Sequence, residues 1–304
     1  MHLVRYAERA TWRQRVGVLN DDEVLPLQDV SGFAELLRRP VSEIRTLIAG
    51  PVMTEASALS DVLLLPPVDG RTEVWAAGVT YERSMDARIE ETTASQDVYA
   101  RVYDAPRPEL FFKSPAWRAV TSGEPIGVRP DAEVTVPEPE LAMLVNVHGE
   151  VLGYTICDDV SSRDIEGANP LYLPQAKIYD GSCSLAALVR PAWEISRPEE
   201  LEIRLVIYRD DQTLLDERTS TKRLHRRLGD LVEHLRGALT LPDGAVLATG
   251  TGIVPGLDLS LRPGDLVEIT IEEVGKLVNP VTLSTSIDWL AAAVDDPSIR
   301  ERSR

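Results

Sequence analysis

The alternation of apolar and polar positions near the N-terminus predicts a small unit of strands and helices. Residues 16–19 and 23–27 are rich in apolar side chains, and they flank the polar residues Asn20, Asp21 and Asp22. Two short apolar runs on either side of a polar turn are typical of a β-hairpin. Residues 33–37 and 41–48 then place their apolar side chains at helical spacing.

A proline-containing stretch over residues 63–70 marks the expected boundary of this unit. We therefore predict a small α+β domain over residues 1–66 and a main domain over residues 67–304. The main domain begins with an apolar run at 74–79 that indicates a buried strand. A polar stretch with helical character follows, from about Ser84 to Ala100.

Beyond residue 110 the pattern is mostly that of strands separated by turns. Residues 201–208 alternate with period two before a polar turn, and residues 262–265 form a turn signal before the strand-like run 266–271. One clear helix is predicted near residues 224–238, capped by Ser220 or Thr221. Its apolar side chains are Leu224, Leu228, Leu231, Leu235 and Ala238. Because few strands alternate with helices, we expect a strand-rich α+β fold.

The most informative segment is residues 136–159, in which two apolar runs flank His148 and Gly149. A tight hairpin centred on this pair would place Glu140 opposite Cys157 and Glu138 opposite Asp159. Side chains alternate between the two faces of a strand, so Glu138, Glu140 and Asp159 are expected on one face.

The remaining side chains of this hairpin divide into a small face and an apolar face. The face shared with the carboxylates carries small residues that leave room, namely Ala142, Gly153, Thr155 and Cys157. The opposite face is expected to point into the core and carries Leu141, Met143, Val145, Leu152, Tyr154 and Ile156. Asp158 would point to that apolar side and is the poorer candidate for a ligand.

Three converging carboxylates repel one another strongly unless a positive charge lies among them. The pattern alone is equally compatible with unrelated acids at solvated strand ends. If a metal is present, oxygen ligands favour Mg²⁺, with Mn²⁺ or Ca²⁺ as alternatives, over zinc or copper. The chain has only four histidines and no HExxH or CxxC motif, which agrees with an all-oxygen site.

Composition narrows the classes of partner. The formal net charge is −17, from 49 acidic and 32 basic residues, so binding to nucleic acid is not expected. No apolar run reaches about 18 residues, and the first nine residues carry charges where a signal peptide needs an apolar run. Two cysteines, Cys157 and Cys183, do not form a disulfide framework. We expect a cytoplasmic protein that does not enter a membrane.

Over about residues 73–285 the chain resembles the fumarylacetoacetate hydrolase superfamily. The resemblance is carried by Glu138-Pro139-Glu140, the run Gly153–Asp164, Lys177, Gly250-Thr251-Gly252 and Leu261–Asp265. It implies a mixed β-sandwich roll and a metal held by Glu138, Glu140 and Asp159. It also implies a homodimer or homotetramer that acts on small 2-oxo acids.

The resemblance also implies roles for Lys177 and Thr251, and the chemistry of the expected reaction adds further candidates. Lys177 is the first candidate for the base or the group that stabilises an enolate, and Glu109 is a second acid–base candidate, with a plain loop carboxylate as its alternative. Thr251 would bind a substrate carboxylate, unless its glycine-flanked position marks only a turn. Arg83 and Ser84 are further candidates for contacts with substrate, although an arginine at a helix start is often solvated.

Within the superfamily, residues 165–177 look most like the dehydratases of 2-keto-3-deoxy pentonates, which convert 2-dehydro-3-deoxy-D-arabinonate into 2,5-dioxopentanoate and water in pentose catabolism. Hydrolytic members use a histidine shortly after the strand that matches residues 75–78, and residues 78–88 contain none. We therefore expect a hydro-lyase. The alternatives are a C–C bond hydrolase or decarboxylase of an acylpyruvate-like acid, and a non-catalytic protein that binds sugar acids.

Overall fold

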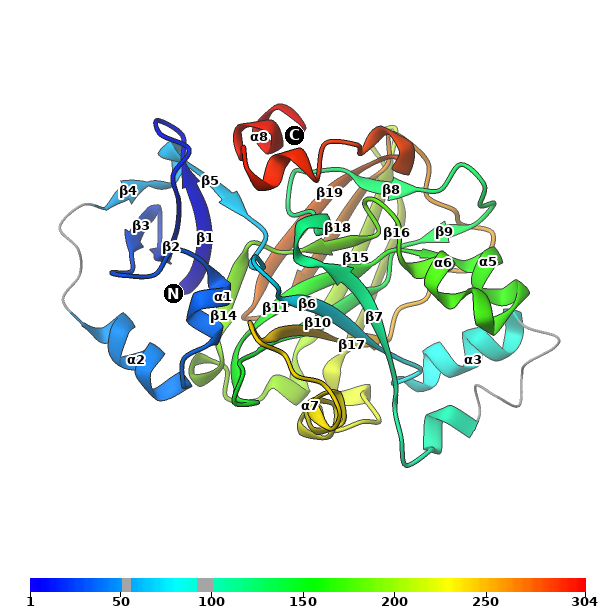
Figure 1. The fold of residues 1–304 in the computed structure, drawn as a ribbon. Coiled ribbons are helices and arrows are strands. Elements are labelled where there is room, and N and C mark those ends of the chain that lie inside the picture. Colours follow the sequence, from blue (N-terminus) through cyan, green and yellow to red (C-terminus); the bar gives the residue numbers. More distant parts are fainter. Residues whose placement is uncertain (51–55, 92–100) are drawn as a thin grey trace.

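Two mixed β-sheets form the framework of the computed structural model, which describes residues 1–50, 56–91 and 101–304 (Figure 1). In the described residues the larger sheet has 12 strands, ten of which run in the order β4-β3-β2-β1-β14-β11-β10-β17-β6-β7, while β13 pairs with β11 and β5 pairs with β1. The smaller sheet has the order β16-β15-β18-β19-β8. The strand-rich α+β class expected from the sequence is confirmed.

The N-terminal strands form one wing of the larger sheet. They are β1 (His2–Glu8), β2 (Gln14–Asn20), β3 (Glu23–Pro26), β4 (Ser57–Ala58) and β5 (Val62–Leu65). The predicted hairpin is confirmed as the β2–β3 pair, and the two predicted helices are α1 (Phe33–Leu37) and α2 (Val41–Ala49). The expectation of a connector from residue 63 was wrong in part, because β5 pairs with β1 and buries Leu63 and Leu65.

The main part of the larger sheet contains β6 (Glu73–Gly78), β7 (Glu109–Pro115), β10 (Pro139–Val145), β11 (Val151–Asp159), β13 (Cys183–Leu185), β14 (Leu188–Pro191) and β17 (Ala245–Thr251). Leu3 of β1 pairs with Val189 of β14, so the sheet continues from the N-terminal wing into the main part. The division at residue 66 stays a prediction.

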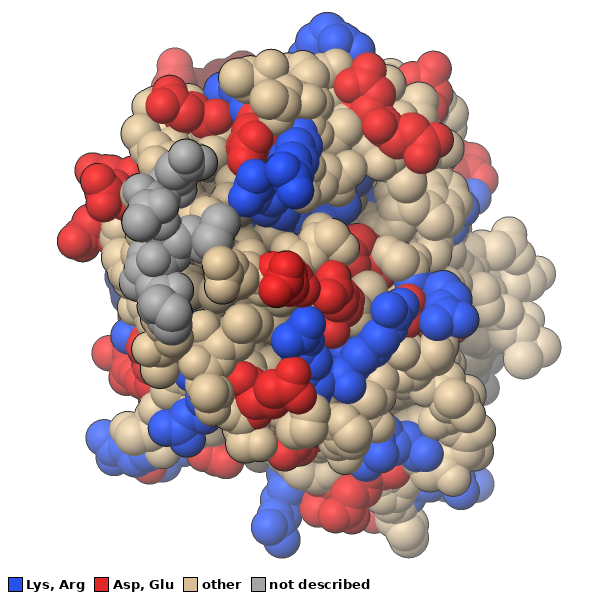
Figure 2. All heavy atoms as spheres, turned by 60° about the vertical axis from the view of Figure 1, so that its left-hand side comes forward, with Lys and Arg blue, Asp and Glu red and all other residues tan. Residues whose placement is uncertain are grey.

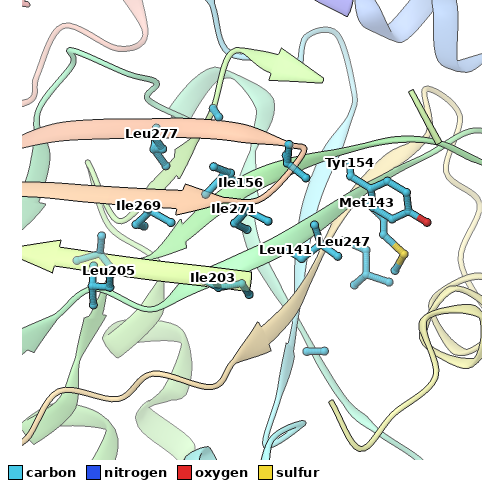
Figure 3. Packing of buried hydrophobic residues seen from close by; sticks show 14 of the residues in the cluster. Leu141, Met143, Tyr154, Ile156, Ile203, Leu205, Leu247, Ile269, Ile271 and Leu277 are labelled. Atoms are coloured by element: carbon cyan, nitrogen blue, oxygen red, sulfur yellow. The ribbon is translucent and has the colours of Figure 1, made fainter. Parts of the chain in front are cut away.

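The smaller sheet packs on one face of β10 and β11 and forms the main core with them. Its strands are β8 (Ile126–Val128), β15 (Glu202–Arg209), β16 (Gln212–Ser220), β18 (Leu266–Ile271) and β19 (Gly275–Leu283). Leu141 and Ile156 of the hairpin belong to one buried cluster with Ile203, Ile269 and Leu277 of this sheet (Figure 3). A separate two-stranded ribbon pairs β9 (Thr135–Val136) with β12 (Ser161–Ser162). In sequence, β9 directly precedes β10 and β12 directly follows β11.

The other face of the β10–β11 hairpin is also buried, so the expectation that its small side chains leave open space was wrong. Ala142, Leu144 and Cys157 pack in a second cluster that includes Phe33 and Leu36 of α1. Small side chains on this face let the N-terminal helix approach the sheet closely.

Leu152 lies on this second face and not on the predicted one. A register shift between Leu144 and Val145, where Val145 pairs with Val151, reverses its side.

The remaining helices are short and lie at the periphery. They are α3 (Glu82–Glu91), α5 (Arg163–Ala168), α6 (Leu173–Lys177), α7 (Leu228–Arg236) and α8 (Ser298–Arg302). The helix predicted from about residue 84 begins at Glu82, and residues 92–100 of that prediction lie outside the described residues.

The start predicted for the helix near residue 224 was too early. Helix α7 begins at Leu228, because Leu224 forms an isolated bridge with Tyr81 and is therefore extended. Ser220 instead caps a single 3₁₀ turn at Thr221–Arg223.

Figure 2 shows acidic and basic side chains interspersed on one face of the molecule. None of the helices in the described part of the chain has the length and hydrophobicity required to cross a bilayer.

Candidate active site and metal centre

The three predicted carboxylates meet at the open end of the β10–β11 hairpin. Pro139 pairs with Asp158, Glu140 pairs with Cys157, and the Asp159 backbone N–H donates to the Glu138 carbonyl over 3.0 Å. This is the register expected from the sequence. It places one oxygen from each of Glu138, Glu140 and Asp159 within 4.8 Å of the others, and all three side chains are at most 3% exposed.

Strand β17 closes one side of this cluster and fixes Glu140. Thr251 pairs with Glu140, and the Gly250 backbone N–H donates to Glu140 Oε2 over 2.7 Å. Gly250 has a φ of +92°, and a Cβ at this position would collide with the Thr80 hydroxyl. Only glycine fits this close approach of the backbone.

Two buried lysines supply positive charge to the cluster. Lys177, at the end of α6, places Nζ 2.9 Å from Glu138 Oε2 and 2.9 Å from Asp159 Oδ2. Lys113, in β7, places Nζ 2.5 Å from Asp159 Oδ1. Lys113 also donates to the Val160 carbonyl over 3.1 Å and to the Lys177 carbonyl over 2.6 Å. Lys113 therefore links Asp159 to the backbone of Lys177.

A buried arginine holds Glu138 from the other side. Arg163 Nη1 lies 3.3 Å from Glu138 Oε1 and 3.2 Å from Glu166 Oε2, and Arg163 and Glu166 are three residues apart on α5. Glu138 therefore has cationic partners on both of its oxygens, whereas Glu140 has the Gly250 N–H.

The pKa values reflect this unequal distribution of partners. Burial, followed by repulsion from Asp159 and Glu138, raises the pKa of Glu140 well above its ordinary value. Burial also acts to raise the pKa of Asp159, but Lys113 and Lys177 outweigh it, and the pKa lies below its ordinary value. Asp158 points away from the cluster, accepts from the Glu138 N–H over 3.0 Å, and has its pKa raised to about 7 by burial. Glu140 is thus the carboxylate whose ionised form is least stabilised, and a positive charge beside it would stabilise that form.

A small cavity of about 20 Å³ adjoins the carboxylates, and most of the predicted site residues line it. Glu109, Ser84, Thr251 and Lys177 contribute to its wall together with the three carboxylates. The Ser84 hydroxyl donates to the Tyr81 carbonyl over 2.7 Å.

The Thr251 hydroxyl donates to the Ile253 carbonyl over 2.9 Å, so this side chain also stabilises a local turn. Arg83 is the exception among the candidates. It is exposed, it does not line this cavity, and its Nη2 lies 3.5 Å from the Val254 carbonyl.

Lys113, Arg163 and Glu166 were not singled out from the sequence. A signal for Lys113 was present, because Glu109, Phe111 and Lys113 occupy alternate positions of one strand and should share a face. Phe111 does line the cavity, and its ring centroid lies 5.6 Å from Lys177 Nζ. Arg163 and Glu166 have the i, i+3 spacing of a helical ion pair, but a short helix there was not predicted.

Comparisons with known proteins agree with this geometry. Residues 73–282 match the model of the family described as fumarylacetoacetate (FAA) hydrolase C-terminal. The chain is 40% identical over 266 residues to the 2-dehydro-3-deoxy-D-arabinonate dehydratase of Saccharolobus solfataricus, and the aligned region covers 86% of this chain and 88% of that protein. It is 43% identical over 262 residues to the probable 2-keto-3-deoxyxylonate dehydratase of Haloferax volcanii, covering 86% and 90%.

A solved structure gives the same result for the fold. The structure of 2-keto-3-deoxy-D-arabinonate dehydratase complexed with magnesium and 2,5-dioxopentanoate is 35% identical to this chain, with a TM-score of 0.79. The match covers 93% of this chain and 99% of that one.

Proposed function

This chain belongs to the fumarylacetoacetate hydrolase family, and we propose that it is a hydro-lyase that converts 2-dehydro-3-deoxy-D-arabinonate, or a closely related 2-keto-3-deoxy pentonate, into 2,5-dioxopentanoate and water. The observation that carries the proposal is the buried cavity in which three carboxylates, Lys177 and Glu109 converge. The names of the two relatives at 40% and 43% identity and the ligands of the related structure support the choice of substrate.

The carboxylates Glu138, Glu140 and Asp159 are the proposed ligands of Mg²⁺. The donor set consists of oxygen atoms only, which suits Mg²⁺, and the raised pKa of Glu140 indicates that this corner of the site is short of positive charge. Mn²⁺ and Ca²⁺ have the same ligand preference and are the alternatives. When bound, the divalent cation would polarise the 2-oxo group and stabilise the negative charge that develops as C3 loses a proton.

The remaining residues of the cavity are proposed to position the substrate and to move protons. Dehydration breaks a C3–H bond and the C4–O bond, and tautomerisation of the unsaturated product then gives the terminal aldehyde. Lys177 is the proposed group near C3, and Glu109, which lines the same cavity, is the second acid–base group. Thr251 and Ser84 are placed to contact the bound acid.

The chemistry of the cavity wall favours elimination over hydrolysis. The described residues that line the cavity include no histidine. Hydrolysis of a C–C bond requires a base that activates water for attack on a carbonyl carbon. Elimination requires no attacking water, because water is its product.

The proposal is tested by following semialdehyde formation from a 2-keto-3-deoxy pentonate with Mg²⁺ and with an excess of chelator. We expect conversion with Mg²⁺ and little or none with chelator, and no cleavage of an acylpyruvate into two acids. Efficient acylpyruvate cleavage without dehydration of the sugar acid would favour the hydrolase alternative. Stoichiometric binding of the sugar acid without turnover would favour the non-catalytic alternative.

The cellular setting and the assembly are part of the same proposal. A cytoplasmic role in pentose catabolism agrees with the two cysteines, Cys157 and Cys183, which are buried and form no disulfide. A homodimer or homotetramer is also part of the proposal, as the membership of the family implies. Light scattering coupled to size-exclusion chromatography would distinguish these states from a monomer.

A further inference from the structure

Gly78, the last residue of β6, lies directly opposite Glu109, the first residue of β7. The two strands are antiparallel neighbours at one end of the strand order of the larger sheet (Figure 1). Side chains of directly opposed residues in such a pair project from the same face of the sheet. Both residues line the cavity beside the carboxylates, so the space that a side chain at position 78 would fill belongs to the wall of the site.

The carboxyl group of Glu109 occupies that space. A Cβ added to Gly78 would collide with Glu109 Oε2, and it would lie 2.8 Å from Glu109 Cδ and 3.4 Å from Glu109 Cγ. These three atoms are the nearest neighbours of such a Cβ in the described part of the chain. The first two approaches are closer than van der Waals contact allows. The Glu109 carboxyl therefore lies over the Cα of Gly78, and it can do so because this residue has no side chain.

The backbone conformation at position 78 does not itself require glycine. The φ of Gly78 lies outside the left-handed region, so an alanine can adopt the same backbone. Gly250 differs in both respects, because its φ is +92° and an added Cβ would lie 2.9 Å from the Ala77 carbonyl oxygen. An alanine at position 78 would thus be accepted by the strand and opposed first by the side chain of Glu109.

The chain that follows Gly78 is anchored, so the glutamate side chain would move before the backbone does. Val79 has a φ of +53°, which is strained for a β-branched residue and persists only where the surroundings hold it. The Thr80 hydroxyl donates to the Thr249 carbonyl over 2.7 Å, and the Thr80 carbonyl accepts from the His225 N–H over 2.9 Å. A partly exposed glutamate, by contrast, can change its rotamer at small cost.

The position of Glu109 matters because it stands at one end of a row of site residues along β7. Glu109, Phe111 and Lys113 alternate along the strand and share a face. At the other end of the row, Lys113 contacts the proposed metal ligand Asp159, and Phe111 lies beside Lys177. The cavity that these residues share is small, so a change in the Glu109 rotamer would change which group a bound acid meets.

We infer that Gly78 is a positioning residue, which keeps the carboxyl of Glu109 folded over the end of β6 and inside the cavity. Gly78 acts through Glu109 and is not a catalytic residue. The acid–base role of Glu109 belongs to the proposed function, so this inference rests on it. The displacement of the Glu109 carboxyl by a side chain at position 78 can be measured independently of that role.

The first test is a double-mutant cycle between Gly78→Ala and Glu109→Ala. The quantity measured is kcat for dehydration of a 2-keto-3-deoxy pentonate at saturating Mg²⁺. We expect Gly78→Ala to lower kcat about 10- to 100-fold in the wild-type background, since a misplacement of about 1 Å has effects of this size. In the Glu109→Ala background there is no carboxyl to displace, so the same substitution should change kcat by less than about twofold.

The second test does not depend on turnover. In crystal structures of the wild type and of Gly78→Ala, the backbone of residues 76–80 should superpose. The Glu109 carboxyl should differ in position by at least about 1 Å, the shift that restores van der Waals contact with the new Cβ. The Mg²⁺ dissociation constant, measured by calorimetry, should be unchanged, because the substitution leaves the three proposed ligands in place.

Gly229→Ala is the matched control for the replacement of a glycine by alanine. Gly229 is exposed in α7, and a Cβ there would meet no heavy atom of the described residues within 4 Å. The substitution should leave kcat unchanged in both backgrounds. It should also raise the Tm slightly, because alanine favours a helix more than glycine does.

Three outcomes would overturn the inference. The first is a wild-type kcat in Gly78→Ala. The second is the same loss in both backgrounds, including a loss through unfolding, since the glycine would then serve the strand and not Glu109. The third is a crystal structure of Gly78→Ala in which Glu109 keeps its position and the backbone has moved. If the wild type does not dehydrate the sugar acid, the proposed function fails, and the position of Glu109 in the two crystal structures then supports or overturns the inference by itself.

Discussion

Replacing Glu140 by glutamine should stabilise the metal-free protein and destabilise the protein in Mg²⁺ relative to wild type. Glu140 is the carboxylate with the least favourable surroundings, because burial and two neighbouring carboxylates raise its pKa well above the ordinary value. A glutamine has the same shape, and its carbonyl oxygen can still accept the hydrogen bond from the Gly250 N–H. The substitution therefore removes charge and little else.

The size of the effect follows from the geometry of the cluster. Two unit charges within 4.8 Å repel by about 3.5 kcal/mol or more at an effective dielectric constant near 20. Glu140 meets two such neighbours, and Lys177 offsets part of the repulsion. We therefore expect relief of about 2–4 kcal/mol at pH 8, or a rise in Tm of roughly 4–8 °C.

The sign of the pH dependence is also fixed. Because the folded-state pKa of Glu140 lies above its unfolded value, ionised Glu140 destabilises the fold increasingly as pH rises, up to the folded pKa. The difference between variant and wild type should therefore be small near pH 5 and should grow as the pH rises above it.

The assay is thermal unfolding of both proteins with chelator and with saturating Mg²⁺. Mg²⁺ at about 1,000 times its dissociation constant should stabilise wild type by about 4.1 kcal/mol, which exceeds the expected relief in the variant, and should stabilise the variant by much less. The order of the two Tm values should consequently invert between the two conditions. A variant that is less stable than wild type in chelator, or that shows the same Mg²⁺ shift as wild type, would refute the reasoning.

Three further substitutions test the surrounding charges. Lys177→Met should still bind Mg²⁺ but should lower the dehydration rate about 100-fold or more, because the lysine is proposed to act on the substrate. The Mg²⁺ dissociation constant tests the first expectation, and kcat tests the second. Lys113→Met should cost about 3–5 kcal/mol of stability in urea titrations, because it leaves Asp159 as a buried charge with one partner fewer; unchanged stability would contradict this. Asp158→Asn should flatten the decline in stability between pH 4 and pH 7, worth about 4 kcal/mol for a pKa of about 7 against 3.8; urea titrations at pH 5 and pH 8 of both proteins measure it.

The carboxylate cluster could be predicted from sequence because it depends on one local hairpin. A hairpin register follows from the position of its turn, and the alternation of faces then brings Glu138, Glu140 and Asp159 together. The prediction held near the carboxylates and failed near the turn. There the register shift at Leu144 and Val145 moved Leu152 to the other face, and no residue type in the sequence marks that shift.

The cationic side chains of the site could be predicted only in part, because their positions depend on contacts between segments that are distant in sequence. Lys113 is 46 residues from Asp159, and its three acceptors come from β11, from the residue after it and from the end of α6. Lys177 was found through the family resemblance and not through its spacing. Arg83 was also a candidate, but it is exposed at the start of α3 and does not line the cavity beside the carboxylates.

The charged side chains around the cavity beside the carboxylates carry an excess of negative charge that a divalent metal would neutralise. Five carboxylates of the described residues line the cavity, those of Glu109, Glu138, Glu140, Asp159 and Glu166. Three cationic side chains, those of Lys113, Arg163 and Lys177, pair with members of this group. When all eight groups are ionised, two negative charges remain among them in a region from which water is largely excluded, and a single divalent cation neutralises them. Arg163 and Lys177 contact the two oxygens of Glu138, and Lys113 and Lys177 contact the two oxygens of Asp159. A bound ion would therefore share these oxygens with the cationic side chains or displace them, whereas Glu140 accepts from the Gly250 N–H. The same register that buries the hairpin in the core thus brings Glu138, Glu140 and Asp159 close enough together to hold one metal ion, as proposed.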